Sequence, residues 1–170
     1  MKSDHLLLIV RLSLALCCMV VAAGAQTRLY TLENDRLRLS LDDKAAVVHL
    51  SNKQSVSGHN YVSRPLPGFW SLIFRRGSSL ENVIEPQMQS YRIEQDGQTL
   101  RVAAGKLRWR GEELEIRLNF TIRLAGDELI WQAKVENRSD AEVTEFFFPT
   151  IGGIARLEME GVTDDLIWPQ

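Results

Sequence analysis

The chain contains little cysteine. Its 170 residues include two, Cys17 and Cys18, and both lie within the first 25 residues. No thiol follows Ala25, which excludes a disulfide framework and any cysteine-based metal site from the rest of the chain. A domain in residues 26–170 must therefore be held together by its hydrophobic core, and a chain of this length is long enough to bury one.

Histidine is also scarce. The three histidines are His5, His49 and His59, and no two of them have the H-x-x-x-H or H-x-H spacing of a metal site. No G-x-S-x-G nucleophile motif is present, although a Ser/His/Asp set built from distant residues stays open. We assign no catalytic, metal-binding or cofactor-binding residue, expect no cofactor, and leave open whether the chain is an enzyme.

The acidic residues give no catalytic pair. Glu112-Glu113 and Asp164-Asp165 are adjacent in sequence, and neighbours on a strand point to opposite faces. A basic stripe is also lacking: Lys and Arg number 20 against 22 Asp and Glu, for a formal net charge of −2. We therefore expect no nucleic-acid partner.

What is present begins with a leader at residues 1–25. The segment has two basic side chains, Lys2 and Arg11, then an apolar run over Leu12–Val21, then Ala23-Gly24-Ala25, which fits a signal-peptidase site. This pattern predicts export to the periplasm or the extracellular space, with no stable membrane span once the leader is cleaved. The alternative is an uncleaved membrane anchor, for which about 20 apolar residues are needed.

After the leader, apolar residues alternate with polar ones in a period of two, and helical periodicity is almost absent. The clearest run is Leu114–Leu124, followed by a turn at Ala125–Glu128 and a returning strand over Leu129–Val135. Asp96-Gly97 marks another hairpin, and Asn52–Pro67 is rich in loop-forming residues. The pattern predicts an all-β, antiparallel β-sandwich. Further strands are expected at 37–41, 45–50, 69–74, 88–95, 99–103 and 142–148.

The strand at 142–148 ends in Phe146-Phe147-Phe148-Pro149, and Gly152-Gly153 follows. The alternation places Val143, Glu145 and Phe147 on one face and Thr144, Phe146 and Phe148 on the other. A ligand site is one interpretation. We favour a strand that runs into the core, ends at the proline and continues into a flexible glycine loop, because aromatic residues in strands are usually buried.

Three residues are weak candidates for contact with sugar: His59, in a polar loop, and Trp70 and Trp168, which stand beside glycine, proline or the chain end. An exposed indole there would stack on a sugar ring. Buried indoles and a solvated loop histidine are the more common case. Trp109 and Trp131 are in phase with apolar neighbours and are expected in the core.

The order of motifs is more specific than any one motif. "PGFWSLIFRR" is followed by "LNFTIRLAGDELIWQAKVENRSD", "VTEFFFPTIGGI" and "DDLIWPQ". This order resembles the N-terminal β-sandwich, of the galactose-mutarotase-like (supersandwich) type, of secreted bacterial glycoside hydrolases. The resemblance spans Leu29–Gln170. It implies that residues 26–170 form the N-terminal part of a larger protein, with the sandwich incomplete at Gln170 and a catalytic (β/α)8 barrel beyond it.

The family's catalytic residues lie in that barrel, so no residue here inherits a catalytic role. The expected function is a non-catalytic, carbohydrate-associated β-sandwich that braces the barrel, with the Asn52–Pro67 and Gly152-Gly153 loops as candidates for contact. A self-contained secreted module for carbohydrate binding or adhesion is the alternative. An apolar segment around Leu166–Trp168 further predicts that the isolated chain self-associates.

Overall fold

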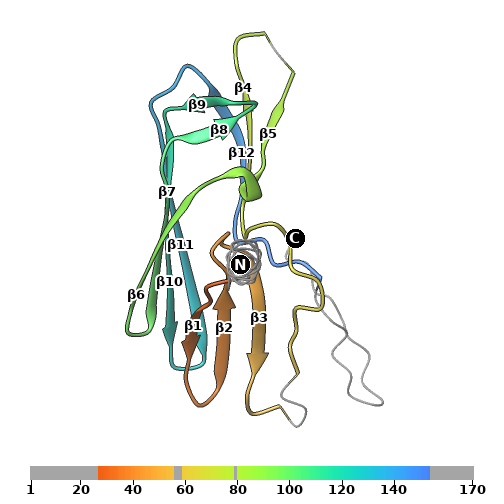
Figure 1. Cartoon of the computed structure of the whole chain (residues 1–170), viewed down its shortest axis with the longest axis vertical. Coiled ribbons are helices and arrows are strands. Elements are labelled where there is room, and N and C mark those ends of the chain that lie inside the picture. Colours follow the sequence, from red (N-terminus) through yellow and green to blue (C-terminus); the bar gives the residue numbers. More distant parts are fainter. Residues whose placement is uncertain (1–26, 56–58, 79, 154–170) are drawn as a thin grey trace, which may run out of the picture.

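The computed structural model describes residues 27–55, 59–78 and 80–153, and this part of the chain is an antiparallel β-sandwich (Figure 1). It contains no α-helix, only one turn of 3₁₀-helix, η1 (Pro86–Met88). The strands are β1 (Tyr30–Glu33), β2 (Leu37–Leu41), β3 (Val47–Asn52), β4 (Ser71–Arg75), β5 (Asn82–Ile84), β6 (Tyr91–Asp96), β7 (Thr99–Ala104), β8 (Leu107–Trp109), β9 (Glu112–Leu114), β10 (Ile116–Ala125), β11 (Glu128–Asn137) and β12 (Glu142–Phe147).

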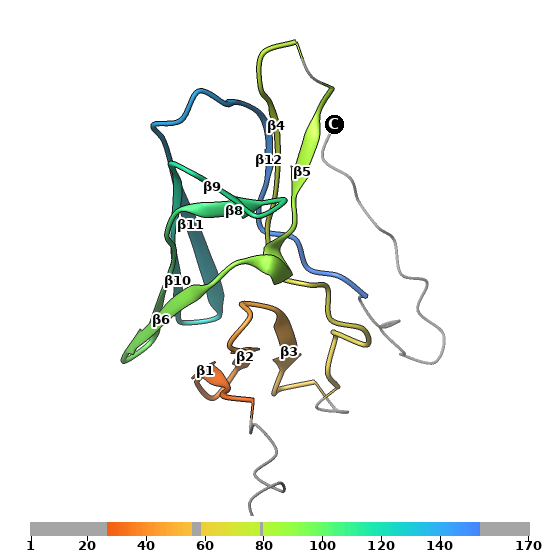
Figure 2. The same ribbon diagram turned by 45° about the horizontal axis from the view of Figure 1, so that its top comes forward.

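These strands form four hydrogen-bonded sheets. The largest has the order β11-β10-β7-β6, and two three-stranded sheets have the orders β1-β2-β3 and β12-β4-β5. The short β8–β9 hairpin is the fourth. In Figure 2 the four-stranded sheet stands opposite the β12-β4-β5 sheet, and the β1-β2-β3 sheet lies below them. Every strand pair is antiparallel.

The β10–β11 hairpin confirms the clearest sequence prediction. Ile116 pairs with Asn137 and the register continues without a shift to Ala125 opposite Glu128. The inward side chains of β10 are all buried, and the register is tightly specified because a shift by one residue would place each of them in water. They are Ile116, Leu118, Phe120, Ile122 and Leu124, each at most 5% exposed.

One continuous core joins the sheets, and aromatic rings fill its centre. Phe69 contacts Phe120 with ring centroids 4.9 Å apart, and Phe148 lies 5.2 Å from Phe120. Phe146 and Phe148 also pack against this core, while Phe147 between them is 46% exposed. The triple phenylalanine is therefore mainly a core element, as favoured from the sequence.

Side-chain amides join the free edge of β1 to the β6–β7 hairpin. Gln95 Nε2 donates to the Thr31 carbonyl oxygen and Gln98 Nε2 donates to the Glu33 carbonyl oxygen, both at 2.8 Å. Nearby, Arg36 pairs with Asp127 at 3.0 Å across to the β10–β11 turn. The two glutamine hydrogen bonds occupy backbone carbonyl groups of β1 that an unprotected edge strand would offer to another chain.

Asn60 covers the opposite edge of the same sheet, at β3. Its side-chain oxygen accepts hydrogen bonds from the backbone N–H groups of Leu50 (3.0 Å) and Val62 (3.1 Å). Its amide nitrogen donates to the Val48 carbonyl at 3.2 Å. One asparagine side chain thus substitutes for a further strand along part of β3.

The sequence predictions fail where strands are short or irregular. The residues of β1, β5, β8 and β9 were not predicted as separate strands, because three or four residues are too few to establish an alternation. The prediction that Met88–Gln95 is a single strand is wrong at its start, since Pro86–Met88 form η1.

Of the predicted two faces of residues 142–148, the part after Thr144 is correct, since Phe146 and Phe148 face the core while Glu145 and Phe147 are exposed, but the placement of Val143 with Glu145 and Phe147 is wrong. A β-bulge between Val143 and Glu145 shifts the register against β4. The extra residue, Thr144, lets Val143 pack against the core together with Phe146 and Phe148. A bulge leaves no signal in a simple count of alternating residues, so the sequence pattern could not reveal it.

Candidate functional site

A pocket of about 560 Å³ lies between β5 and the β8–β9 hairpin. We call it the β5–β8 pocket. Its lining combines apolar surface with both donors and acceptors of hydrogen bonds, and its residues are Glu81, Asn82, Val83, Glu85, Met88, Arg108, Trp109, Arg110 and Gly111. Val83 is 51% and Met88 66% exposed, so these two side chains contribute apolar area that is open to solvent.

Trp109 forms one wall of the pocket. The prediction that it lies in the core is correct only in part: it is partly buried and its ring meets Phe74 edge-on at 5.3 Å. The guanidinium of Arg110 lies 4.8 Å above the same indole. The indole is therefore held between the core and the Arg110 guanidinium, and both side chains line the pocket in a fixed relative orientation.

Arg110 is held in a backbone conformation that favours glycine or asparagine. It has φ of +48° and Gly111 has φ of +87°, as expected for a two-residue turn between the paired residues Trp109 and Glu112. An arginine in the left-handed region costs on the order of 1–2 kcal/mol. The turn nevertheless places this arginine at the pocket, beside Trp109.

The buried Gln89 positions the β8 side of the pocket. Its side-chain oxygen accepts from the Arg108 backbone N–H at 2.7 Å, and its amide nitrogen donates to the Arg108 carbonyl at 2.9 Å and the Glu85 carbonyl at 3.0 Å. Gln89 is only 4% exposed. These three bonds fix β8 against the segment before η1, so the two walls of the pocket keep their spacing.

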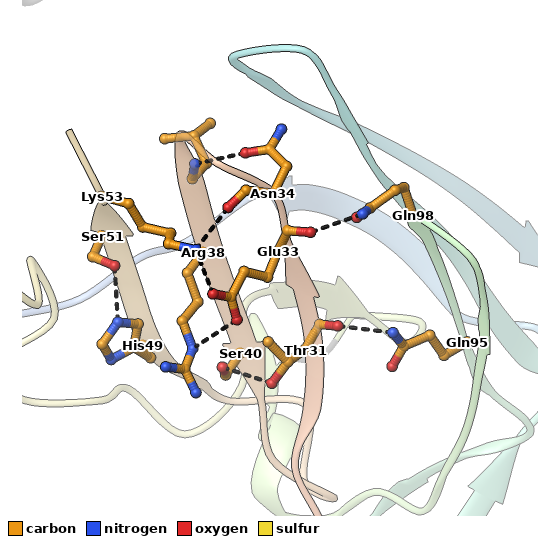
Figure 3. Close-up of polar contacts among 11 residues, drawn as sticks. Thr31, Glu33, Asn34, Arg38, Ser40, His49, Ser51, Lys53, Gln95 and Gln98 are labelled. Atoms are coloured by element: carbon orange, nitrogen blue, oxygen red, sulfur yellow. Dashed lines mark hydrogen bonds and ion pairs between the residues drawn. The ribbon is translucent and has the colours of Figure 1, made fainter.

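A second polar cluster covers one face of the β1-β2-β3 sheet (Figure 3). Lys53 Nζ lies 2.7 Å from a carboxylate oxygen of Glu33, and Arg38 Nε lies 3.7 Å from the other. The hydrogen bond from Lys53 holds the pKa of Glu33 below its ordinary value, opposed by partial desolvation. Glu33 therefore stays ionised at neutral pH and is unsuited to act as a general acid there.

The same face contains a serine–histidine pair. His49 Nε2 and Ser51 Oγ are 2.9 Å apart (Figure 3), within the range of a nucleophile and its base. Ser51 is only 3% exposed, so a substrate does not reach its hydroxyl group. Thr31 and the buried Ser40 form a comparable pair at 2.9 Å. We interpret both pairs as satisfied polar groups of the sheet rather than as catalytic groups.

The three sugar-contact candidates from the sequence are not brought together as a site. Trp70 is 1% exposed and its Nε1 donates to the Tyr91 hydroxyl at 3.0 Å, so it is a core residue and no exposed platform. His59 is exposed, on the loop beside Asn60. Trp168 and the Leu166–Trp168 segment lie outside the described residues.

The two loops suggested for contact do lie side by side. Ser63 donates to the Gly153 carbonyl from its backbone N–H at 2.7 Å and from its hydroxyl at 2.6 Å. A β-carbon at Gly152 would overlap Leu66, and one at Gly153 would lie 2.4 Å from the Arg64 carbonyl oxygen. The expectation of a flexible glycine loop is therefore wrong, because this segment is closely packed against residues 63–66.

The β5–β8 pocket was not predicted as a site from the sequence. The "RWRG" stretch, Arg108–Gly111, could have indicated this pocket, because two arginines flank a tryptophan there before a turn. The in-phase position of Trp109 instead suggested a fully buried ring. Within the described part of the chain, no group of three or more His, Cys, Asp or Glu side chains is placed to hold a metal ion.

Comparison of the chain with protein-family models, with curated proteins and with solved structures gives no match. Among residues 27–55, 59–78 and 80–153, no helix has the length and apolar character of a membrane span.

Proposed function

We propose that this chain is a non-catalytic, carbohydrate-associated β-sandwich, and that the β5–β8 pocket is where it binds sugar. One observation carries the proposal: Trp109 lies in a pocket of about 560 Å³ together with arginine, asparagine and glutamate side chains. A pyranose has apolar C–H faces and polar hydroxyl edges. A lining that pairs an indole with hydrogen-bonding side chains is complementary to both.

Polar side chains at the pocket supply hydrogen-bonding groups for a ligand. The Arg108 guanidinium lies 3.5 Å from Glu113, and Glu85 accepts a hydrogen bond from Gln87 at 3.0 Å. These contacts place a guanidinium and a carboxylate at the pocket, where they supply donors and acceptors for the hydroxyl groups of a sugar. Val83 and Met88 supply exposed apolar area next to the indole.

Binding to soluble polysaccharides tests this proposal. We would measure the retardation of the protein in native gels containing β-glucan, xylan, mannan or pectate, followed by calorimetry with oligosaccharides of the polymer that retards it. Trp109→Leu should abolish retardation while retaining apolar contact with Phe74. Arg117→Ala, on the outer face of β10, is the matched control and should bind normally. Binding that survives Trp109→Leu would reject the pocket.

The sequence resemblance supports a further part of the proposal, namely that the sandwich belongs to an exported glycoside hydrolase and braces a catalytic (β/α)8 barrel. The second candidate is a self-contained secreted module, and the exposed pocket favours it because such a module needs a binding surface of its own. The gene decides between them. A reading frame that continues past Gln170 into alternating strand and helix patterns supports the first, and a stop codon there supports the second.

A further inference from the structure

β11 is a ten-residue strand at the edge of the largest sheet, with β10 on one side. The turn Gly126-Asp127 joins the paired residues Ala125 and Glu128, which therefore exchange hydrogen bonds. Hydrogen-bonded and non-hydrogen-bonded pairs alternate along an antiparallel ladder. The backbone N–H and C=O groups of Leu129, Trp131, Ala133 and Val135 thus point away from β10, where no described strand pairs with them.

The inner face of β11 is also less covered than that of its neighbour. Phe120 on β10 is 2% exposed, whereas Ala133, directly opposite on β11, is exposed. Ile122 is fully buried, whereas its partner Trp131 is only partly buried. The core therefore ends along β11 and leaves both backbone groups and apolar side chains at this edge.

The edges of the small sheet contrast with this one. Gln95 and Gln98 cap β1, and Asn60 caps β3. β11 has one basic side chain, Lys134, and its Nζ lies 2.7 Å from a carboxylate oxygen of Glu136 on the same strand. β6, the other edge of the four-stranded sheet, has six residues, so β11 offers the longer edge of that sheet as a template for pairing with another chain.

We propose that β11 pairs antiparallel with β11 of a second copy of this chain, about a two-fold axis through Trp131. In this register Leu129 faces Ala133 of the other copy, and Gln132 faces Ile130. Glu128 faces Lys134, and the symmetry repeats this opposite-charge pair. Because residues 128 and 134 bond to β10 on their inner side, the new pairs are non-hydrogen-bonded ones, in which side chains approach most closely.

Charge disfavours the neighbouring register. Moving the axis to residue 132 places Glu128 opposite Glu136 twice, and like charges directly opposite are destabilising. Moving it to residue 133 pairs residues 129–137 of the two copies, but it removes the contact between Glu128 and Lys134 and places Glu128 opposite Arg138, which lies beyond the end of β11. The register centred on Trp131 is therefore the one in which strand residues alone supply complementary charges.

Sedimentation velocity of the full chain, exported so that any leader is processed, tests the proposal. We expect a monomer–dimer equilibrium in the micromolar range, because one strand pair is a small interface. Lys134→Glu should weaken dimerisation at least about tenfold, since two attractive pairs become repulsive. Glu128→Lys should do the same, and the double swap Glu128→Lys/Lys134→Glu should restore the dimer.

The double swap separates the interface from effects within one chain. It restores the pairs between copies but does not restore the contact between Lys134 and Glu136, so recovery of the dimer cannot come from repairing that contact. Circular dichroism checks that each variant folds. A wild type that stays monomeric throughout the micromolar range overturns the proposal, as does a dimer that neither single substitution weakens. Neither result bears on sugar binding at the β5–β8 pocket.

Discussion

The indole nitrogen of Trp70 donates a hydrogen bond to the hydroxyl oxygen of Tyr91 at 3.0 Å, and that hydroxyl donates in turn to the Pro86 carbonyl at 2.9 Å. This relay joins the segment before β4 to β6 and η1, and it satisfies the one polar atom of a tryptophan that is 1% exposed. Burial raises the pKa of Tyr91, so its hydroxyl remains a donor across the accessible pH range.

Tyr91→Phe should therefore destabilise the fold although it removes a single atom. The Trp70 N–H and the Pro86 carbonyl would both lose their partner, and an unsatisfied buried polar group costs about 1–3 kcal/mol. Urea unfolding followed by tryptophan fluorescence measures the change. Tyr30→Phe, at a partly buried tyrosine on β1, is the matched control. Equal midpoints for the two variants would show that the relay contributes nothing to stability.

The strands that were predicted correctly are those in which burial alternates without interruption. In β10, Leu118 and Ile122 are buried while the residues that follow them, Asn119 and Arg123, are exposed, and this contrast is visible in the sequence. This alternation of apolar and polar residues follows directly from a strand that has one face on the core and the other in solvent.

The pocket could not be predicted in the same way. Trp109 has the same alternating context as a core residue, and its place in the pocket depends on how β5 and η1 lie relative to the β8–β9 hairpin, which are far apart in the sequence pattern. Gln89 is another example, because a polar residue between strands usually faces solvent. Its burial depends on three backbone partners that the fold supplies, at Glu85 and Arg108.

Substitution of Gly153 and of Gly97 by alanine separates two costs: the left-handed backbone conformation, which both share, and contact of the new β-carbon with its surroundings, which occurs only at Gly153. Both have left-handed φ, +58° and +54°, and a β-carbon at Gly97 meets nothing within 4 Å. Gly97→Ala should cost about 1 kcal/mol for the backbone conformation alone. Gly153→Ala should cost clearly more, because its β-carbon would also meet the Arg64 backbone. Urea midpoints of the two variants test this order, and the reverse order would show that residues 63–64 yield easily.

The last prediction concerns pH and His49. Partial burial lowers the pKa of His49, and the nearby charge of Arg38 lowers it further, while Glu33 acts in the opposite direction. The unfolded chain therefore binds a proton at a higher pH than the folded chain does. Between these two pKa values the unfolded state binds more protons, so the free energy of unfolding falls as the pH decreases from the ordinary value of 6.5.

His49→Gln should remove this part of the pH dependence, since glutamine does not titrate and its amide can still bond to Ser51. We would compare urea midpoints at about pH 7.5 and 5.5, on either side of the ordinary histidine pKa. This window lies above the range in which Glu33, whose pKa is lowered from 4.5, becomes protonated. The wild type should lose stability at the lower pH and His49→Gln should lose less. His59→Gln, at an exposed loop histidine, is the matched control. If His49→Gln and the wild type lose equal stability between the two pH values, protonation of His49 is not what weakens the fold in acid.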